Sequence, residues 1–326
     1  MTPSPSVWIL TDGKAGDEQP LAGIADAMGV IPEFRRVKPR RLFALLMPWG
    51  PIDCRDWPSR FGSPIAPPYP DICLATGRRA VAYLRQLKRL SPTTCTVLFK
   101  DPRTRRHGAD LVIVQAHDKL RGPQVKVVTT APNRLTPSRL DAIRSDPPAD
   151  LVALSSPRLA VLVGGNSRHH QFSSMDVARL IAGLEQRIAD GAALMITASR
   201  RTPPVLAAAL RSLAENHDRV VFWNGEGTNP LAAYMALADE LIVTADSTNM
   251  IGEAASTGHP IQIFHPTGGH RKIASFIDLL RQDACIGSFP DAPVTGSYLP
   301  INSTNDIAEA VLAAWQGMQD GGRGRR

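Results

Sequence analysis

Short apolar runs alternate with helix-like segments and polar loops along the first half of the chain. The runs predict strands, and two of the segments between them predict helices. The predicted strands are 7–10, 72–75, 93–99, 111–114 and 125–129, and the predicted helices are 20–28 and 80–89. Residues 50–70 are rich in proline, which predicts an irregular loop.

The second half repeats this alternation. Its predicted strands are 159–163, 194–197, 219–222, 241–244 and 261–264, and its predicted helices are 174–189, 205–216, 231–238, 250–256 and 305–318. Ser173 and Asp176 have capping-box spacing at the start of 174–189. The last helix carries Ile307, Val311 and Trp315 on one face, and a disordered tail is expected at 321–326.

Alternating strands and helices indicate parallel sheets wrapped by helices, with functional loops along one edge. The segment 145–158 is rich in Pro and Ser and interrupts the alternation, so it is the best candidate linker. The predicted fold class is therefore α/β, with two Rossmann-like, doubly wound domains and a cleft between them. We place the first domain at 1–147 and the second at 158–302.

Composition agrees with a globular protein of two domains. The chain has 326 residues, and its longest apolar run, 42–47, is far too short to cross a bilayer. Its start lacks the basic region and long apolar core of a signal peptide. The four cysteines have no metal-like spacing and predict reduced thiols: Cys54, Cys73, Cys95 and Cys285. We expect a cytoplasmic protein, soluble or peripheral on the inner face of the membrane.

The net charge of +7 is concentrated in the first half. Residues 1–150 hold 23 Lys and Arg against 14 Asp and Glu, whereas residues 151–326 hold 14 against 16. Such asymmetry indicates an anionic partner for the first domain. Charge alone is compatible with phospholipid, nucleic acid or a phosphorylated substrate.

A cationic cluster runs directly into the apolar segment L-F-A-L-L-M-P-W. This pairing suits a membrane surface, where basic side chains meet anionic headgroups and contribute about 1 kcal/mol each. Leu42, Phe43, Leu46 and Trp49 would then enter the interface. The alternative is a core-packing helix with a solvated basic start. The predicted membrane-facing basic residues are Arg35, Arg36, Lys38, Arg40 and Arg41.

The loop T-D-G-K-A-G-D-E-Q follows the first predicted strand. Gly13 and Gly16 permit a tight turn at the edge where open α/β sheets hold ligands. The loop has neither the G-x-G-x-x-G pattern nor the Lys-Ser/Thr ending of a phosphate loop. It is either part of a site or a connecting loop with solvated charges. Its candidate acceptor-side residues are Asp12, Gly13, Lys14, Gly16 and Gln19.

The stretch 239–264 predicts a nucleotide-binding strand, turn and helix. Polar, cap-type residues follow the strand, and the helix that starts at Met250 would present free N–H groups to a phosphate. Glu253 lies one turn past Asn249 and could hold the two hydroxyls of a ribose. The alternative is a solvated Glu253 and a plain N-cap at Ser247. The candidate residues here are Asp246, Ser247, Thr248, Asn249, Met250 and Glu253.

Two further loops of the second half follow strands and converge on this site. The glycines of the first would let the backbone approach a pyrophosphate, and the arginines of the second could pair with its oxygens. For the arginines the alternative is a surface charge. His169 and His170 have no ligand-type partner at suitable spacing, so no metal is predicted. The candidate residues are Gly164, Gly165, Asn166, Ser167, Ser199, Arg200 and Arg201.

Two resemblances extend this interpretation. The Ser-rich turn, the helix with Glu then Ala, and G-H-P before a strand resemble the donor site of GT-B glycosyltransferases. An example is the enzyme that adds N-acetylglucosamine to the peptidoglycan lipid precursor. Nearly the whole chain resembles the mitochondrial fission protein family first known from plants, which has many bacterial members. The motifs include W-I-L-T-D-G-K-A-G-D-E-Q, L-V-G-G-N-S, S-R-R-T-P and V-T-A-D-S-T-N-M-I-G-E.

The resemblances imply a GT-B-like fold in which a terminal helix, 303–320, returns to the first domain, on the acceptor and membrane side. Bacterial members are often labelled as nucleoside-diphosphate-sugar enzymes. Plant members act as recruitment factors at the mitochondrial surface, which implies peripheral membrane association. The peptidoglycan transferase has a histidine in its first loop, and the loop 12–19 has none.

We therefore predict a protein that binds a nucleoside diphosphate sugar, with uridine as the expected nucleoside. The predicted activity is metal-independent glycosyl transfer to a membrane-associated acceptor, without a cofactor or a nucleic-acid partner. The alternatives are a sugar-nucleotide epimerase and a non-catalytic membrane adaptor of the fission type. Asp17 or Glu18 would act as base if its surroundings raise its pKa. His117 or Asp118 is the second choice.

Overall fold

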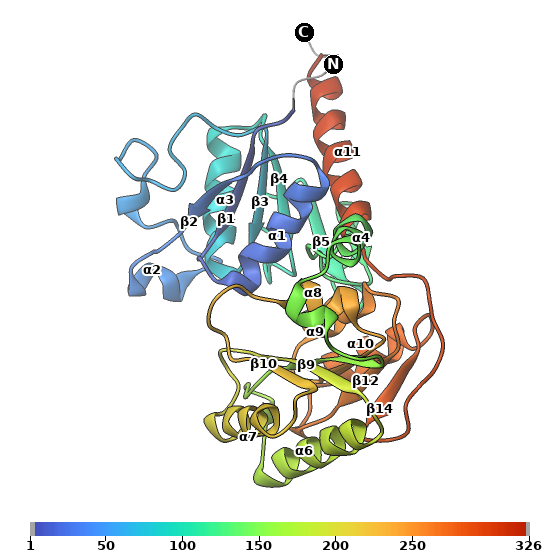
Figure 1. The fold of residues 1–326 in the computed structure, drawn as a ribbon. Helices are drawn as coiled ribbons and strands as arrows, with labels where there is room; N and C mark the ends of the chain where they lie inside the picture. Colours follow the sequence, from blue (N-terminus) through green and yellow to red (C-terminus); the bar gives the residue numbers. More distant parts are fainter. Residues whose placement is uncertain (1–3, 324–326) are drawn as a thin grey trace. The chain divides into compact units, whose positions relative to one another are not determined.

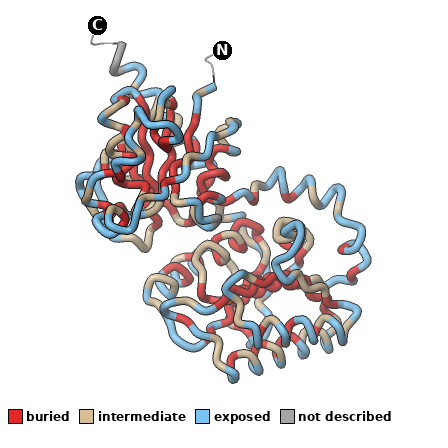
Figure 2. Tube along the Cα trace, turned by 90° about the vertical axis from the view of Figure 1, so that its left-hand side faces the viewer, coloured by how far each residue is buried: buried red, intermediate tan, exposed pale blue. Residues whose placement is uncertain are grey.

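The computed structural model describes residues 4–323 and divides the chain into two compact units. Unit 1 comprises Met1–Arg134 and Ser303–Arg326, and unit 2 comprises Leu135–Asn302. Each unit is built on a six-stranded parallel sheet, which confirms the predicted α/β class. Figure 2 shows buried residues concentrated in the centre of each unit. Among the described residues, no helix has both the length and the apolar character needed to cross a bilayer.

Unit 1 has the strand order β2-β1-β3-β4-β5-β6 (Figure 1). Successive strands are added on one side of β1 as far as β2 and then on its other side from β3 onward. The loops that follow β1 and β3 therefore flank a topological switch point. The elements are β1 Val7–Thr11, α1 Ala15–Ala27, β2 Glu33–Arg36, α2 Arg41–Leu46, η1 Cys54–Asp56, β3 Ile72–Thr76, α3 Arg78–Leu90, β4 Cys95–Phe99, β5 Leu111–Gln115, β6 Val125–Val128 and α11 Thr304–Arg323.

Both faces of this sheet are covered, because alternate residues of a strand point to opposite faces. Trp8 and Leu10 of β1 pack with α3 on one face. Val7 and Ile9 pack with α1 and α11 on the other. The last helix thus belongs to the core of unit 1. It extends to Arg323, into the tail expected to be disordered, of which 324–326 lie outside the described residues.

Unit 2 has the strand order β10-β9-β7-β11-β12-β14. Numbered within the unit this is the 3-2-1-4-5-6 order of dinucleotide-binding folds, with its switch point between β7 and β11. The elements are α4 Pro137–Ser145, α5 Ala149–Val152, β7 Arg158–Val163, β8 His170–Gln171, α6 Ser174–Ala189, β9 Ala193–Ala198, α7 Pro204–Glu215, β10 Val220–Trp223, α8 Leu231–Leu237, β11 Glu240–Thr244, α9 Thr248–Ala255, β12 Ile261–Phe264, β13 Thr267–Gly268, α10 Arg271–Leu280 and β14 Ile286–Phe289.

The two faces of the second sheet are also covered. Leu159 and Val161 of β7 pack with α6 and α7, whereas Ala160 and Leu162 pack with α8, α9 and α10. The predicted capping box of α6 is present, with the Ser173 hydroxyl accepting from the Asp176 N–H. Doubly wound packing therefore fixes the strands rigidly and leaves their carboxyl-end loops free to form a site.

The expected linker at 145–158 is not the division that the structure makes, which lies between Arg134 and Leu135. Residues 135–158 form α4, α5 and their connections, and Leu140, Leu151 and Leu154 are buried in the core of unit 2. Proline at the first turn of a helix is compatible with helix formation. Within 145–158, Pro148 caps the start of α5 and Pro157 directly precedes β7, so these prolines stand at the starts of elements and do not mark a linker.

Other elements also differ from the sequence prediction. Helix α1 begins at Ala15 and contains Pro20 in its interior, so residues 15–19 are helical and not part of a loop. Strand β2 was not predicted, because Glu33–Arg36 is polar and lies at the sheet edge, where one side is exposed. Helix α10 and strand β14 were also not predicted.

The packing of α11 predicts a large loss of stability when its core face is truncated. Ile307 is fully buried between α1 and the sheet. The Ile307→Ala variant should lower the free energy of unfolding by about 2–5 kcal/mol, because it leaves a cavity. Urea denaturation followed by tryptophan fluorescence measures this loss. Glu309→Ala on the exposed face of α11 is the matched control, and an equal effect of both variants would contradict the assignment.

Candidate nucleotide site

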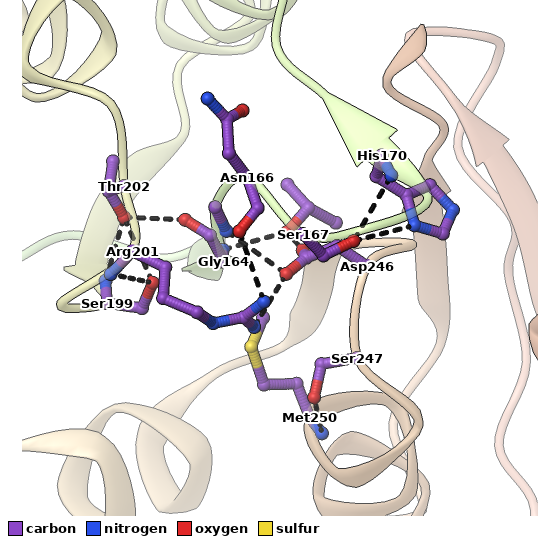
Figure 3. A network of polar contacts seen from close by, with 12 residues as sticks. Gly164, Asn166, Ser167, His170, Ser199, Arg201, Thr202, Asp246, Ser247 and Met250 are labelled. Carbon is purple, nitrogen blue, oxygen red and sulfur yellow. Dashed lines mark hydrogen bonds and ion pairs between the residues drawn. The ribbon is translucent and has the colours of Figure 1, made fainter. Parts of the chain in front are cut away.

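The three predicted loops of unit 2 meet at the switch point, where the Asp246 carboxylate joins them (Figure 3). One carboxylate oxygen accepts from the Gly165 N–H at 3.0 Å and from the Arg201 guanidinium at 2.9 Å. The other accepts from the Thr244 hydroxyl at 2.7 Å. The side chain of Asp246 is fully buried. Asp246, predicted to contact the nucleotide, is therefore committed to holding the loops together.

Gly164 and Gly165 are required by this close packing. A Cβ at Gly164 would lie 2.0 Å from an Asp246 carboxylate oxygen, and a Cβ at Gly165 would lie 2.0 Å from the Arg201 carbonyl oxygen. From the sequence alone, these glycines predict the close approach of a pyrophosphate. The structure gives a second and sufficient reason, which is the contact of the loop after β7 with its two neighbours.

Two threonines outside the predicted site residues connect these segments: Thr202 joins the loop after β9 to the loop after β7, and Thr244 joins the loop after β7 to the end of β11. The Thr202 hydroxyl donates to the Gly164 carbonyl and accepts from the Ser199 N–H at 2.9 Å. The Thr244 hydroxyl accepts from the Gly164 N–H at 2.8 Å. Their signal in the sequence was position, because each threonine ends a strand or lies in the loop that follows one.

Asn166 and Ser167 shape the loop after β7 from within. The Asn166 side-chain oxygen accepts from the Phe172 N–H at 2.9 Å. The Ser167 hydroxyl accepts from the backbone N–H groups of His169 and His170 at 3.2 and 3.1 Å. These side-chain oxygens therefore act as local turn acceptors.

Helix α9 presents its N-terminus at the carboxyl end of β11. The Ser247 hydroxyl accepts from the Met250 N–H at 3.5 Å, so Ser247 is the N-cap, as one of the two interpretations expected. The helix begins at Thr248, two residues earlier than predicted. The Thr248 and Asn249 N–H groups precede the first intrahelical bond and have no acceptor within residues 4–323. They are available to an anion.

Glu253 lies on the same helix, one turn beyond Asn249. Its side chain is half-buried, and burial raises the pKa of its carboxyl to about 7. Within the described chain the carboxyl makes no ion pair or side-chain hydrogen bond that would offset this desolvation. Glu253 thus differs from Asp246, because its carboxyl group has no ion-pair or side-chain hydrogen-bond partner in the described chain.

The two arginines of the loop after β9 have different surroundings. Arg201 is paired with Asp246 but keeps 47% of its side chain exposed. Arg200 is exposed, and within residues 4–323 it has no carboxylate partner. Arg200 therefore has an unpaired guanidinium, whereas the charge of the neighbouring Arg201 guanidinium is balanced by Asp246.

The histidines of this region form a pair with tilted rings and a buried neighbour. The rings of His169 and His270 lie 4.3 Å apart between centroids. His170 is buried, and burial lowers its pKa, so its neutral form is favoured. Across the described ranges no three His, Cys, Asp or Glu side chains gather where they could hold a metal ion.

The predicted acceptor-side residues of unit 1 lie at its own switch point, after β1. Asp12 pairs with Lys14 at 2.6 Å, and Gly13 has φ +85°, which favours glycine. Gly16 and Gln19 are exposed on the first turns of α1. Asp17 pairs with Lys100 at 2.8 Å, and Lys100 itself has the positive φ of 75° that is uncommon for a residue with a side chain.

Glu18 is not suited to the catalytic role predicted for it. Its carboxylate is buried and accepts two hydrogen bonds from Arg36, at 2.7 and 2.9 Å, and one from the Thr11 hydroxyl at 3.2 Å. The bonds from Arg36 lower the pKa of Glu18, whereas a base near neutrality needs a raised one. Glu18 joins α1 to the end of β2.

This ion pair predicts a pH-dependent contribution to stability. The folded pKa of Glu18 lies below the ordinary value of 4.5, so the stabilisation is complete above that value and is lost as pH falls through the folded pKa. Glu18→Gln should lower the free energy of unfolding by about 1 kcal/mol at pH 7, because solvent screens the half-exposed Arg36. In urea denaturation the difference should shrink at acid pH.

The control for this variant is Glu33→Gln, which removes the exposed partner of Arg35. Exposed pairs contribute little, so this variant should stay within about 0.5 kcal/mol of the wild type at every pH. A Glu18→Gln effect that is constant from pH 7 to pH 3 would contradict the structural role of Glu18.

Solved structures share this fold. A UDP-glucosyltransferase from Polygonum tinctorium matches with a TM-score of 0.53 and 10% identity, over 98% of this chain and 94% of that chain. A UDP-GlcNAc 2-epimerase from Neisseria meningitidis, solved bound to UDP-GlcNAc, gives a TM-score of 0.52 at 10% identity, over 94% and 99% of the two chains. The fold is GT-B.

Sequence comparison identifies the family. The chain is 27% identical over 269 residues to "Mitochondrial fission protein ELM1" of Arabidopsis thaliana, which covers 74% of this chain and 63% of that relative's length. The chain thus spans less than two thirds of this relative. Residues 15–315 match the family described as Mitochondrial fission ELM1, and this range includes all three loops of the site. The chain therefore belongs to the mitochondrial fission ELM1 family.

Proposed function

We propose that unit 2 binds a nucleoside diphosphate sugar, with uridine as the nucleoside, at its switch point. The observation that carries this proposal is the N-terminus of α9, whose first N–H groups are free and lie next to two rigid loops. The Thr248 and Asn249 N–H groups would meet the diphosphate, together with Arg200 and the exposed side of Arg201.

Glu253 is the proposed partner of the ribose. Two hydroxyl donors from a ribose would satisfy the carboxylate and compensate the burial that raises its pKa. The Asp246 network has a supporting role, because it holds the loop after β7 and the loop after β9 against α9. The fold agrees with this proposal, since both matched solved proteins are named for UDP-sugar substrates.

We further propose a metal-independent glycosyl transfer to a membrane-associated acceptor, at the cytoplasmic face of the membrane. In this reaction an acceptor oxygen bonds to the anomeric carbon, and the bond from that carbon to the diphosphate oxygen breaks. A base takes the acceptor proton. Asp17 is the proposed base, because it lies at the switch point of unit 1 and its one partner among the described residues is the partly exposed Lys100, whereas Glu18 accepts three hydrogen bonds from Arg36 and Thr11. The helix N-terminus and Arg200 would balance the leaving diphosphate charge.

A second function, that of a non-catalytic adaptor at a membrane surface, is supported by family membership. An adaptor could use the same fold with or without a bound nucleotide. The two functions differ in turnover, because only an enzyme releases nucleoside diphosphate. An epimerase would interconvert the sugar without needing an acceptor.

Calorimetry with UDP-GlcNAc tests the binding site. Glu253→Ala should weaken binding by about 1–3 kcal/mol, the value of a lost hydrogen bond to a charged group. The matched control is Glu185→Ala on the exposed face of α6, which should leave the affinity unchanged. Equal affinity of wild type and Glu253→Ala would remove Glu253 from the ribose. If the intact protein binds no sugar nucleotide, the adaptor is the better account.

A turnover assay tests the reaction. Purified protein is incubated with a panel of sugar nucleotides, with and without bacterial membrane lipid and with EDTA, and released diphosphate and sugar products are measured. Lipid-dependent, EDTA-resistant release should fall by at least about a hundredfold in Asp17→Asn, as expected for a lost general base. Asp26→Asn, further along α1, is the control. Binding with neither diphosphate release nor a change of the sugar would contradict the enzyme, and lipid-independent interconversion of the sugar would indicate the epimerase.

A further inference from the structure

Helix α2 and the residues after it carry an apolar face that points outward. Leu42, Leu45, Leu46 and Trp49 are 76%, 70%, 57% and 66% exposed. Leu45 and Leu46 follow Leu42 by three and four residues, so the three leucines share one side of α2, whereas Trp49 lies beyond the end of the helix at Leu46. Ala44 is the buried residue of α2. This helix has the inverse of the usual arrangement, in which the large apolar side chains face the core.

The backbone of this segment is held in place by polar contacts, without using the leucines. Arg78 donates to the Ala44 carbonyl at 2.9 Å, and Arg85 donates to the Pro48 carbonyl at 3.0 Å. At the start of α2, Arg40 makes a two-pronged pair with the buried Asp53 carboxylate. The outward side chains are therefore presented by a fixed element.

The charge around this face is positive. Residues 34–52 contain no Asp or Glu. Of the five basic residues predicted to face a membrane, three are already paired, with Glu33, Glu18 and Asp53. Lys38 and Arg41 are exposed and, in the described part of the chain, have no carboxylate partner. The free cations are thus Lys38 and Arg41.

We propose that the α2 face, formed by Leu42, Leu45, Leu46 and Trp49 with Lys38 and Arg41, docks in the headgroup region of an anionic lipid bilayer. Leucine and tryptophan beside free lysine and arginine form the chemistry that such an interface takes. A second copy of the chain would bring the same unpaired cations against this face, whereas an anionic lipid surface is complementary to them, so a bilayer is the better occupant.

This inference extends the membrane part of the proposed function, but it is tested without a sugar nucleotide or turnover. The full chain is floated with vesicles of phosphatidylcholine alone or with added phosphatidylglycerol. Wild type should bind the anionic vesicles, and binding should weaken with salt. Leu42→Ser with Leu45→Ser should reduce it by at least about tenfold. Lys38→Ala and Arg41→Ala should each reduce it by about fivefold.

Matched controls come from exposed residues of the same type in other places. Met175→Ser with Val205→Ser replaces two exposed apolar residues of unit 2, and Lys126→Ala with Arg211→Ala replaces two exposed cations. Both double variants should leave vesicle binding unchanged. The α2-face variants and the controls should all keep the wild-type melting temperature. Quenching of tryptophan by brominated lipid should be lost in Trp49→Phe.

Two results would overturn the proposal. One is wild-type protein that does not float with anionic vesicles, or α2-face variants that float as well as the controls. The other is a wild-type dimer, seen by light scattering, that dissociates in Leu42→Ser with Leu45→Ser while vesicle binding is unaffected. That result would assign the face to a second copy of the chain. Neither result depends on whether unit 2 binds a nucleotide.

Discussion

The buried carboxylate of Asp246 is the interaction on which the candidate site depends. A buried charge is costly unless it is paired and hydrogen-bonded, and here one oxygen meets Arg201 and the Gly165 N–H while the other meets Thr244. Because Gly165 and Arg201 come from two other loops and Thr244 ends β11, the charge is satisfied only when the three segments are assembled. The same contacts hold the backbone beside the N-terminus of α9.

Carboxylates in this protein divide into two chemical groups. Asp246 and Glu18 are buried, paired with arginine and used to connect elements of one unit. Glu253 is half-buried and makes no such pair, and burial raises its pKa to about 7. A desolvated carboxyl without hydrogen-bond partners lowers the stability of the fold unless a ligand supplies them. Glu253 therefore indicates a binding role, whereas Asp246 and Glu18 have structural roles.

The GT-B fold and the family membership constrain function without deciding it. Enzymes and adaptors can share one fold, because function depends on the particular site. Two surfaces of this chain bear on its function independently of each other. The switch point of unit 2 offers donors for an anion, and the α2 face of unit 1 offers apolar and cationic side chains for a surface. A membrane-bound transferase uses both, whereas an adaptor needs only the second.

The sequence by itself determined the α/β class, most strands, the capping box at Ser173 and the three loops of unit 2. These follow from local patterns, since apolar runs, cap residues and glycines act within a few residues of their positions. It did not predict β2, because a polar edge strand has no apolar run. It also predicted a linker at the Pro-rich segment 145–158, which contains α5.

Only the tertiary structure decided the role of each polar side chain. Asp246, Glu18 and Glu253 look alike in sequence. The arginine partner of Asp246 lies 45 residues away and that of Glu18 lies 18 residues away, whereas Glu253 has no such partner among the described residues. Burial and pairing across such separations determine whether a carboxylate is a clamp or a ligand group. The same holds for the apolar residues of α2. The sequence predicts Leu42, Phe43, Leu46 and Trp49 at a membrane surface, whereas the fold packs Phe43 against the core of unit 1 and exposes Leu45 instead.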